Sequence, residues 1–484
     1  MVSKEILDQY ITTIGIECHV QLKTKTKLFA AVSNDARDAS PNTLISHICL
    51  GMPGALPVLN EKAVELASLA GFALGTEPQL FSKFDRKHYF YPDLPKGYQV
   101  TQFDKPIIIG GQVTIKVDGQ VKKIGVERAH LEEDAGKITH PAGKDYSLVD
   151  LNRAGTPLLE IVSMPDMHSS AEAKAYAHEL YLLMRYADVS DADLYQGNMR
   201  FDVNVSVSKD PKKLGTRSET KNLNSFRSIE KAVEYEVKRQ IELLETGQKI
   251  VQETRGWDDA KQKTFSQRSK EDAHDYRYMP EPDVPPVELD QKMIDRLKQD
   301  FPLMPIQIRA KLSGLGIDDS AVETIVDDMT LCKFMLDVVD ETGQKHARRI
   351  ANWLTSDVQG MVASGRLTWD SAKLDVKTLS ELSQMAEDSK VNSTAAKQIV
   401  ADLVLKGGEP LSIAQNKNLL QVSDEAEIEG IVAKVLQDNP KAAEDVKNGE
   451  MKAIGFLVGQ VMKASAGKAN PGLAQKLIKK QLGV

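Results

Sequence analysis

The sequence predicts an α+β protein, in which an N-terminal mixed α/β cradle with an antiparallel-rich sheet precedes all-α helical and tail domains. Apolar and polar residues alternate with a period of two in several segments of the first half, which is typical of half-buried strands. Four prolines within residues 280–286 indicate a stiff linker. Beyond this linker, apolar residues recur at helical spacing. We therefore expect three domains, at residues 1–290, 291–408 and 409–484.

The composition limits the class of protein. The chain has 484 residues, a formal net charge of −7 and 41% hydrophobic residues, and this length is too great for a single core. No apolar stretch approaches the roughly 20 residues of a membrane-spanning helix. The N-terminus has no apolar signal-peptide core, and three cysteines without a C-x-x-C motif argue against disulfides. We therefore expect a cytoplasmic protein without membrane contact, in which nucleic acid could be bound only by a local basic patch.

The first strand is expected at Ile11–Leu22. Its apolar residues alternate with polar ones, so Glu17 and His19 face away from the apolar layer. Residues two apart on a strand lie ~6–7 Å apart on one face. A carboxylate and an imidazole at this separation can share a divalent cation or relay a proton. An isolated pair of this kind is more often the solvated face of an amphipathic strand, so the rest of the chain has to decide between the two interpretations.

Further polar strand faces favour a site. Asp118 and Gly119 predict a hairpin turn within residues 113–121. The return strand continues into residues 126–134, where alternation places His130 and Glu132 on one face. Residues 148–160 add Asp150, Asn152 and Glu160, and residues 201–208 alternate in the same way. Together these segments predict a sheet that forms the floor of a polar cleft.

One helix is expected to run from an N-cap at Asn60 to Leu74. Two long helices are expected to cover the other face of the sheet. The first begins with a capping box formed by Ser169 and Glu172, and the second covers about residues 226–245. In the C-terminal half, residues 322–339 predict one helix of the middle domain.

The last 34 residues are basic. From Met451 to Val484 the sequence has six lysines and no Asp or Glu. A cationic surface of this kind suits a phosphate backbone, although a solvated helical face is an equally good interpretation of the residues alone. The six are Lys452, Lys463, Lys468, Lys476, Lys479 and Lys480.

Six long motifs resemble the B subunit of the heterotrimeric aspartyl/glutamyl-tRNA amidotransferases, and the likeness spans the chain. The motifs are IGIECHVQL, KFDRKHYFYPDLPKGYQ, HLEEDAGK, LVDLNRAGTPLLEIVS, KNLNSFRSIEKAVEYE and QETRGWDDA…RSKEDAHDYRYMPEPD.

The resemblance implies a ligase that forms a carbon–nitrogen bond with glutamine as amido donor. Such proteins use ATP to convert the side-chain carboxylate of Glu-tRNA(Gln) or Asp-tRNA(Asn) into an acyl phosphate. Ammonia, which the amidase (A) subunit releases from glutamine, then forms the amide. The implied partners are this amidase, the small (C) subunit and the tRNA, and the implied cofactors are ATP with Mg²⁺ or Mn²⁺.

The resemblance also implies roles for particular residues. It assigns the metal to Glu17, His19 and Glu132, with Glu160 as a weaker candidate, and it places Lys87 on the ammonia path. The strand alternation favours Glu132 over Glu133 as the catalytic carboxylate. Arg153 and Lys221 are candidates for phosphate or carboxylate contact, although a salt bridge at the rim of the cleft is an equally good interpretation. For tRNA binding, the resemblance favours the tail, and we select Lys463, Lys468 and Lys476.

One departure from the family concerns zinc. Many relatives have four cysteines, in F-C-x-C and C-x-x-C-L-G motifs, whereas this chain has FAAV at residues 29–32 and SHICLG at residues 46–51. Because only Cys49 remains, no zinc is expected.

Two other classes of function fit part of the pattern. A metal-dependent hydrolase could use Glu17, His19 and Glu132, and a non-catalytic tRNA-binding scaffold would need only the helical domains and the lysines. The sequence has no P-loop, so motifs do not place the adenine site.

Overall fold

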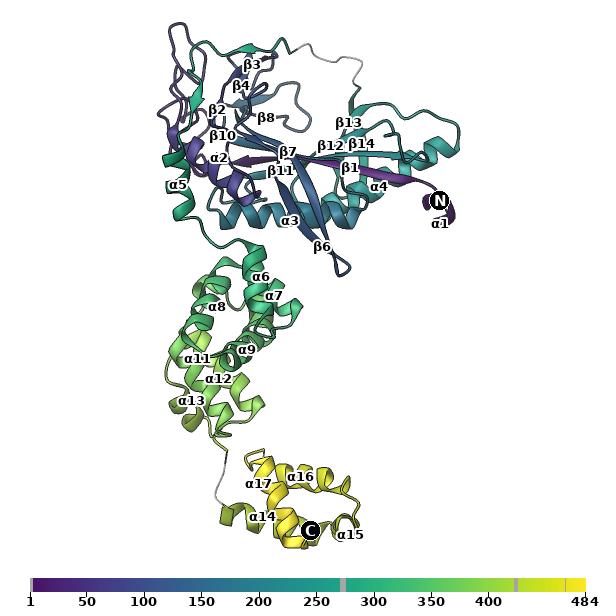
Figure 1. Ribbon diagram of the computed structural model, residues 1–484, viewed down its shortest axis with the longest axis vertical. Helices are drawn as coiled ribbons and strands as arrows, with labels where there is room; N and C mark the ends of the chain where they lie inside the picture. Colours follow the sequence, from purple (N-terminus) through teal and green to yellow (C-terminus); the bar gives the residue numbers. More distant parts are fainter. Residues whose placement is uncertain (1–2, 270–275, 422–424, 466) are drawn as a thin grey trace. The chain divides into compact units, whose positions relative to one another are not determined.

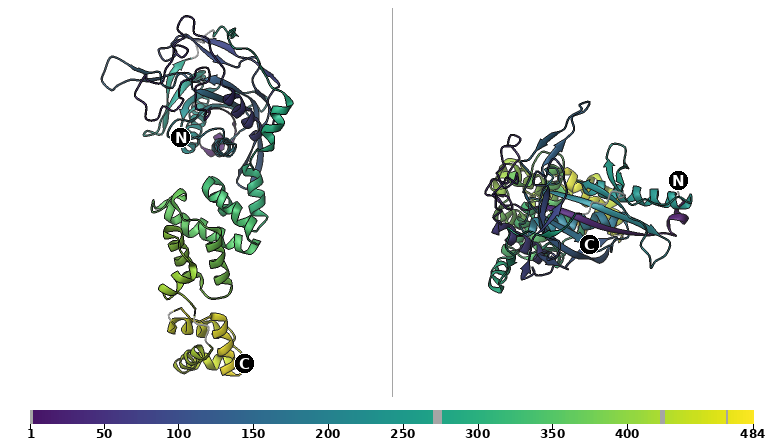
Figure 2. Two further views of the ribbon diagram at one scale, coloured as in Figure 1. Left: turned by 90° about the vertical axis from the view of Figure 1, so that its left-hand side faces the viewer. Right: turned by 90° about the horizontal axis from the view of Figure 1, so that it is seen from above.

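The protein is α+β, as predicted, and divides into two compact units in the computed structural model. The structure describes residues 3–269, 276–421, 425–465 and 467–484. The first unit ends at Ile306 and the second begins at Gln307. The first contains the sheet, and the second is helical, drawn in green to yellow in Figures 1 and 2. Residues 270–275, which belong to one of the motifs, lie outside the described part.

A long mixed sheet forms the first unit, with β1 (Ile11–Gln21) near its middle. The strands run in the order β14-β13-β12-β11-β1-β10-β7-β4-β3-β15. Among the described strand pairs, β12 with β13 alone is parallel. The bounds are β3 Asp85–His88, β4 Tyr98–Thr101, β7 Gln120–Glu133, β10 Pro157–Ser163, β11 Met199–Ser208, β12 Ser218–Leu223, β13 Glu253–Asp258, β14 Lys263–Ser269 and β15 Met279–Pro280.

Short strands complete this unit. β5 (Ile108–Ile109) and β6 (Gln112–Val117) pair with β7, and the β6–β7 hairpin turns at Asp118 and Gly119 as predicted. Two further pairs are β2 (Phe81–Ser82) with β16 (Val287–Glu288), and β8 (Lys137–Thr139) with β9 (Leu148–Asp150).

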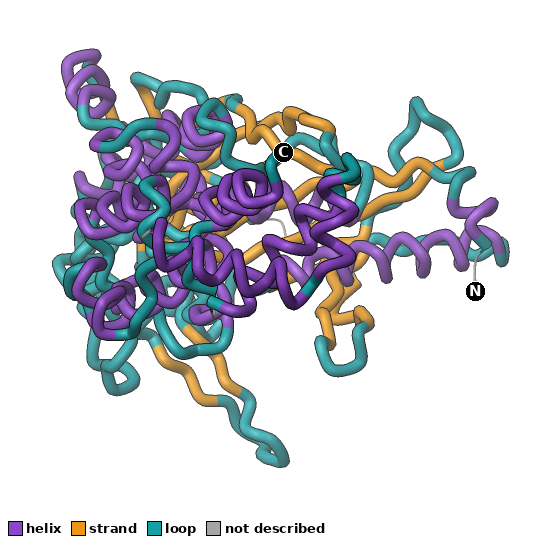
Figure 3. Tube along the Cα trace, turned by 90° about the horizontal axis from the view of Figure 1, so that it is seen from below, coloured by secondary structure: helices purple, strands orange, loops and turns teal. Residues whose placement is uncertain are grey.

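Two long helices, α3 (Ser170–Tyr186) and α4 (Phe226–Glu245), pack on each other and against the sheet (Figure 1). The apolar side chains of β1, such as Ile16, Cys18 and Val20, are fully buried with Tyr176 of α3 in the core of this unit. A third helix, α2 (Glu61–Ala73), packs against β7 and α5 (Gln291–Gln299). The first described helix is the short α1 (Lys4–Leu7), beside the N in Figure 3. With helices on one face, the polar residues of the strands are left on the other.

The helix starts follow the sequence closely. The side chain of Asn60 accepts a hydrogen bond from the Lys62 amide, and that of Ser169 accepts one from the Glu172 amide at 3.1 Å. The predicted capping box is only half present, because the Glu172 carboxylate accepts from the amide of His168, one residue before the N-cap.

The proline-rich stretch lies within the first unit. β15 and β16 pair with β3 and β2 on either side of it. Arg86 of β3 also donates two hydrogen bonds of 2.8 Å to the carboxylate of Glu281. The prolines therefore lie between two strands that pair within the first unit. This unit ends at Ile306, which is past the expected end at residue 290. The further division of the helical part into 291–408 and 409–484 stays a prediction.

The prediction of a single helix over residues 322–339 is wrong. Residues 322–339 form two helices, α7 (Asp319–Asp327) and α8 (Met329–Glu341), and not one. Asp328 between them is extended, with φ −118° and ψ 118°, and its carboxylate accepts hydrogen bonds from the amides of Thr330 and Leu331. The side chain of Asp328 thus caps α8 and ends the continuous helix.

The remaining helices of this unit pack around apolar side chains, and the last four have a core cluster of their own, centred on residues such as Val432, Leu457 and Leu477. Among the described residues no helix is long and apolar enough to cross a membrane. The other helices are α6 Pro305–Ser313, α9 Gln344–Asn352, a π-helical segment Trp353–Val358, α10 Gln359–Ala363, a 3-10 turn Trp369–Ser371, α11 Val376–Glu387, α12 Ser393–Lys406, α13 Pro410–Asn416, α14 Glu425–Asp438, α15 Pro440–Lys447, α16 Ala453–Ala464 and α17 Pro471–Leu482.

Candidate active site

A row of polar residues crosses neighbouring strands on the face of the sheet opposite the buried Cys18. His19 of β1 lies directly opposite Glu160 of β10, and Glu160 lies opposite His130 of β7. On the other side of β1, Glu17 lies opposite Asp202 of β11. Directly opposed residues share one face of a sheet. The strand register therefore brings residues from four separate strands into one place.

The His19 cluster, composed of His19, Glu132 and Glu160, is a candidate metal site. The ligand atoms of these three side chains all lie within 4.8 Å of one another. The His19 Nε2 atom is 3.6 Å from a Glu160 oxygen and 3.8 Å from a Glu132 oxygen. One imidazole nitrogen and carboxylate oxygens suit Mn²⁺, and the carboxylates suit Mg²⁺. The structure thus brings together His19, Glu132 and the weaker candidate Glu160.

Charges within this cluster shift its titration. Burial disfavours a charged His19, but the hydrogen bond and charge of Glu160, with the charges of Asp202 and Glu132, raise its pKa to about 9. Burial acts to raise the pKa of Glu160, but His130 and His19 together hold it well below its usual range. The site therefore concentrates negative charge, which attracts a cation.

His130 is a site residue that we did not select from the sequence. Its Nε2 atom lies 3.6 Å from Glu132 and 3.5 Å from Glu160, so it faces the same two carboxylates as His19. Its Nδ1 atom is buried and has no hydrogen-bond partner among the described residues. The alternation of residues 126–134 puts His130 and Glu132 on one face of a strand, and this pattern was the signal in the sequence from which His130 could have been selected.

Glu17 belongs to a second cluster, which we call the Glu17 cluster, composed of Glu17, Asp202 and Glu219. The carboxylate oxygens of these residues also lie within 4.8 Å of one another. Burial, followed by the charges of Glu160, Glu219 and Asp202, raises the pKa of Glu17. Asp202 was visible in the sequence only as one polar residue of a strand face, and no sequence pattern linked Glu219 to Glu17.

Lys221 joins the Glu17 cluster. Its Nζ atom is 2.7 Å from Asp202 and 3.0 Å from Glu219. Burial alone would lower the pKa of Lys221, but the charges of Asp202 and Glu219 raise it by more than burial lowers it. These two carboxylates therefore stabilise the ammonium form of the lysine. The salt bridge considered from the sequence is present, at the rim of the polar face.

Lys87 of β3 also faces the site. Its Nζ atom lies 4.9 Å from the centre of the Tyr276 ring. Burial lowers its pKa, but the charge of Glu132, then Tyr278 and Glu160, raise it more. Lys87 is therefore a half-buried cation whose charge interacts with Glu132 and Glu160 of the His19 cluster.

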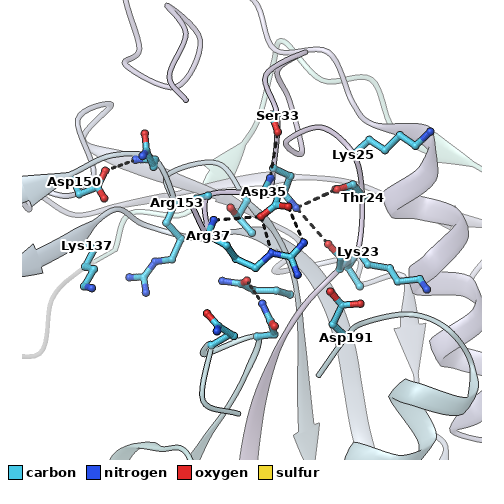
Figure 4. Close-up of a pocket in the computed structure, with 18 residues that line it drawn as sticks. Lys23, Thr24, Lys25, Ser33, Asp35, Arg37, Lys137, Asp150, Arg153 and Asp191 are labelled. Carbon is cyan, nitrogen blue, oxygen red and sulfur yellow. Dashed lines mark hydrogen bonds and ion pairs between the residues drawn. The ribbon is translucent and has the colours of Figure 1, made fainter. Parts of the chain in front are cut away.

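Arg153 lines a polar cavity of about 740 Å³ at the end of β1. Figure 4 shows Lys23, Lys25, Arg37, Lys137 and Arg153 around this cavity, with Asp35, Asp150 and Asp191. Arg153 lies 3.3 Å from Asp134 and donates to the carbonyls of Ala135 and Gly136. Asp134 also accepts from Arg200 at 2.8 Å and from Gln21, which lies two residues beyond His19. This cavity therefore continues from the polar face and has more basic than acidic groups.

The positions of the missing cysteines do not fit zinc. Cys49 is buried, and its neighbours at the other positions are Ala30, Val32 and Ser46. The Nζ atom of Lys27, a residue that is 1% exposed, lies 3.7 Å from the Cys49 Sγ atom. It donates to the carbonyls of Leu44 and Ala154 at 2.6 Å each. The buried ammonium of Lys27 therefore links the segments that contain Leu44, Cys49 and Ala154.

The basic tail is partly neutralised by α14. Lys480 pairs with Glu429 at 2.9 Å and lies 3.8 Å from Glu425. Lys463, Lys468 and Lys476 have no ion pair among the described residues, and Lys463 and Lys476 are exposed. The three selected lysines thus keep their charge available for a ligand.

Comparison with known proteins identifies the family of the chain. The GatB/GatE catalytic domain matches residues 12–295, and the domain described as GatB domain matches residues 333–482. The chain is 44%, 42% and 46% identical to relatives named as the B subunit of aspartyl/glutamyl-tRNA(Asn/Gln) amidotransferase, from Trichodesmium erythraeum, Carboxydothermus hydrogenoformans and Alkalilimnicola ehrlichii. Each alignment covers 98% of this chain and at least 98% of the relative. The chain therefore belongs to the GatB family, the B subunits of these amidotransferases.

Proposed function

We propose that this chain is the component of a tRNA-dependent amidotransferase that activates Glu-tRNA(Gln), Asp-tRNA(Asn) or both. The side-chain carboxylate of the misacylated amino acid attacks the γ-phosphorus of ATP, which gives an acyl phosphate and ADP. Ammonia then attacks the acyl carbon and displaces phosphate, which gives the amide. The observation that carries this proposal is the row of His, Glu and Asp residues across one face of the sheet in a chain of this family.

The His19 cluster and the Glu17 cluster are suited to hold Mg²⁺ or Mn²⁺. An anionic carboxylate and an anionic triphosphate repel each other, and a divalent cation held by these residues would supply the positive charge that neutralises them. His19, Glu132 and Glu160 would hold one ion, and Glu17 and Asp202 offer carboxylate oxygens beside it. We propose Glu132 as the catalytic carboxylate, because it is buried and accepts a hydrogen bond from Thr101 at 3.4 Å.

Cationic side chains complete the site. Burial lowers the pKa of Lys87, but the charge of Glu132 raises it more, so the lysine is suited to orient the negatively charged acyl phosphate by its charge. Lys221 lies at the opposite end of the polar row and is suited to hold a phosphate group by its charge. Ammonia has to arrive unprotonated to act as a nucleophile, which requires a path shielded from water.

The tRNA would contact two basic regions. The cavity at the end of β1 has five basic residues and continues from the catalytic face, so it suits the phosphates near the aminoacylated end. The tail lysines Lys463, Lys468 and Lys476 suit the backbone of the tRNA body. We propose the amidase (A) subunit and the small (C) subunit as protein partners, and a cytoplasmic location with the other enzymes of translation.

An amidation assay with the assembled enzyme tests this function. Misacylated Glu-tRNA(Gln) or Asp-tRNA(Asn), glutamine and ATP are supplied, and the amide and ADP are measured. We expect about one ADP per amide, with ammonium chloride able to replace glutamine. Release of the amino acid from the tRNA without ADP would indicate a metal-dependent hydrolase, and tRNA binding without either product would indicate a scaffold.

A further inference from the structure

Arg200 of β11 lies on the polar face of the sheet, and no step of the proposed mechanism uses it. In the strand ladder it lies directly opposite His19 of β1, while Asp202, two residues further on, lies opposite Glu17. Residues two apart on a strand share one face. Arg200 is therefore a cation beside the His19 cluster, and it comes from a strand that supplies no residue to that cluster.

The side chain of Arg200 extends across this polar face. β1 and β10 lie between β11 and β7 in the sheet, and Asp134 directly follows the end of β7. The Arg200 Nη2 atom donates to the Asp134 Oδ2 atom at 2.8 Å, and the Gln21 side-chain amide donates to the same oxygen at 3.3 Å. The guanidinium therefore lies near Gln21, which is two residues beyond His19 on β1.

Most of the hydrogen-bonding capacity of this guanidinium is unused. A guanidinium has five N–H donors, and among the described residues Asp134 is the one hydrogen-bond partner of the Arg200 side chain. Only 18% of that side chain is exposed, and a buried donor without a partner is costly. Arg153 differs, because besides its contact with Asp134 it donates to the carbonyls of Ala135 and Gly136. Of the two arginines that share Asp134, Arg200 is thus the one with donors for an additional acceptor.

The neighbours of Arg200 connect the His19 cluster with the basic cavity at the end of β1. Gln21, which shares Asp134 with Arg200, lines this cavity. So does Asn198, whose amide donates to Gln21 at 2.9 Å. His19, the ladder partner of Arg200, belongs to the candidate metal site. An amino acid carried into the cavity on the end of a tRNA would therefore meet Arg200 beside the His19 cluster.

We propose that Arg200 binds the side-chain carboxylate of the amino acid attached to the tRNA, and that it thereby distinguishes this substrate from the amide product. A planar guanidinium binds a carboxylate through two parallel charge-assisted hydrogen bonds. The amide product is uncharged and has a single acceptor oxygen, and its NH₂ group would face the N–H donors of the guanidinium. This inference rests on the proposed function and names the residue that recognises the group to be activated.

Binding of two tRNAs that differ only in this group provides the test. Glu-tRNA(Gln) and Gln-tRNA(Gln) are titrated against the assembled enzyme without ATP, so that no activation occurs. We expect wild-type enzyme to bind Glu-tRNA(Gln) about tenfold more tightly than Gln-tRNA(Gln). Arg200→Gln should lose this preference by weakening the binding of Glu-tRNA(Gln) alone.

Two further variants make the comparison specific. Arg200→Lys keeps the charge and a donor for Asp134, so it should retain part of the preference, and it decides the question if Arg200→Gln does not fold. Arg217→Gln is the matched control, because it removes the same charge at an exposed residue that precedes β12 in the first unit. This control should keep the full preference for Glu-tRNA(Gln).

An equal loss of affinity for both tRNAs in Arg200→Gln would overturn the proposal, because Arg200 would then hold the RNA or the fold and not the carboxylate. An unchanged preference in Arg200→Gln and Arg200→Lys would overturn it as well. If wild-type enzyme forms the amide but binds both tRNAs equally, the role of Arg200 is wrong while the proposed function stands. If Arg200 supports a preference for Glu-tRNA(Gln), but neither ADP nor the amide forms when ATP and glutamine are added, the proposed function is wrong and the role of Arg200 in binding the carboxylate stands.

Discussion

At the scale of single residues, the site depends on a few carboxylates whose surroundings are fixed by the strand register. Glu132 faces His19, His130 and Thr101 at distances between 3.4 and 3.8 Å. Its neighbour Glu133 points to the other side, where it pairs with Lys96 and accepts the Val100 amide. Glu132 therefore belongs to the candidate metal site, whereas Glu133 stabilises the fold through Lys96 and the Val100 amide.

Replacement of Glu132 by Gln should abolish activation of the substrate. The amide keeps the shape of the side chain but removes a negative charge from the proposed metal site, so acyl phosphate formation should fall about 100-fold or more. The KM for tRNA should stay within a few fold, because the tail is unchanged. ADP release that depends on misacylated tRNA measures the effect. Glu127→Gln, an exposed carboxylate on the same strand, is the control. A Glu132→Gln enzyme with normal amidation would contradict the assignment.

Metal analysis tests the loss of the zinc site. Because Ala30, Val32 and Ser46 stand where relatives have cysteines, and the Lys27 ammonium lies beside Cys49, we expect no stoichiometric zinc after a chelator wash. Zinc bound at one ion per chain would disprove this expectation.

Lys27→Met should lower the melting temperature of the protein, because the carbonyls of Leu44 and Ala154 would lose a buried donor, and added zinc should not restore the melting temperature.

At the scale of elements, alternation and capping residues were sufficient to predict much of the first unit. β1, the β6–β7 hairpin, α3 and α4 all lie where the patterns indicated, because their signals are local. The grouping of Glu17 with Asp202 and Glu219 was not predictable, since it depends on which strands pair and in which register. The break at Asp328 was missed because apolar spacing continues across it, while the cap is made by a single side chain.

Glu236 of α4 provides a test of how this helix is held on the sheet. It is fully buried, accepts hydrogen bonds from Arg239 and Ser218, and forms an ion pair with Arg255 at 3.0 Å. Burial raises its pKa, but Arg239, Ser218 and Thr264 lower it more, so the folded pKa lies below the usual value of 4.5. Glu236→Gln removes one of the two carboxylates, Glu236 and Glu253, that face Arg239 and Arg255, and should cost about 3 kcal/mol at pH 7.

The sign of this pKa shift fixes the pH dependence. Because the pKa is lower in the folded state, the stabilisation by Glu236 is fully present above about pH 4.5 and is lost as the pH falls through the folded pKa. The difference in free energy of unfolding between wild type and Glu236→Gln should therefore shrink below that pH. Denaturant unfolding followed in the first unit at pH 7 and pH 4 measures it. A difference that stays constant or grows on acidification would contradict the assignment.

At the scale of the whole molecule, chemistry and tRNA binding are assigned to different units. The proposed catalytic residues lie on the sheet of the first unit, and Lys463, Lys468 and Lys476, which have no ion pair among the described residues, lie in the second. The sequence predicted this division through composition, because residues 451–484 lack acidic groups. It could not show that Glu425 and Glu429 of α14 neutralise Lys480, which depends on how the last helices pack.

Replacement of Lys463, Lys468 and Lys476 by Ala should separate tRNA affinity from catalysis. Each lost phosphate contact reduces the salt slope of binding by about 0.7 to 0.9, so the slope should fall by up to about 3. The KM for tRNA should rise, while kcat at saturating tRNA should change little, since no proposed catalytic group lies in the second unit. The matched control replaces Lys377, Lys390 and Lys406, which are exposed lysines of the same unit with acidic partners. This control removes the same net charge, so an equal loss of affinity would show a general charge effect and no tail site. If kcat collapsed while the affinity and its salt slope stayed the same, the tail would be part of the active site and this division between the units would be wrong.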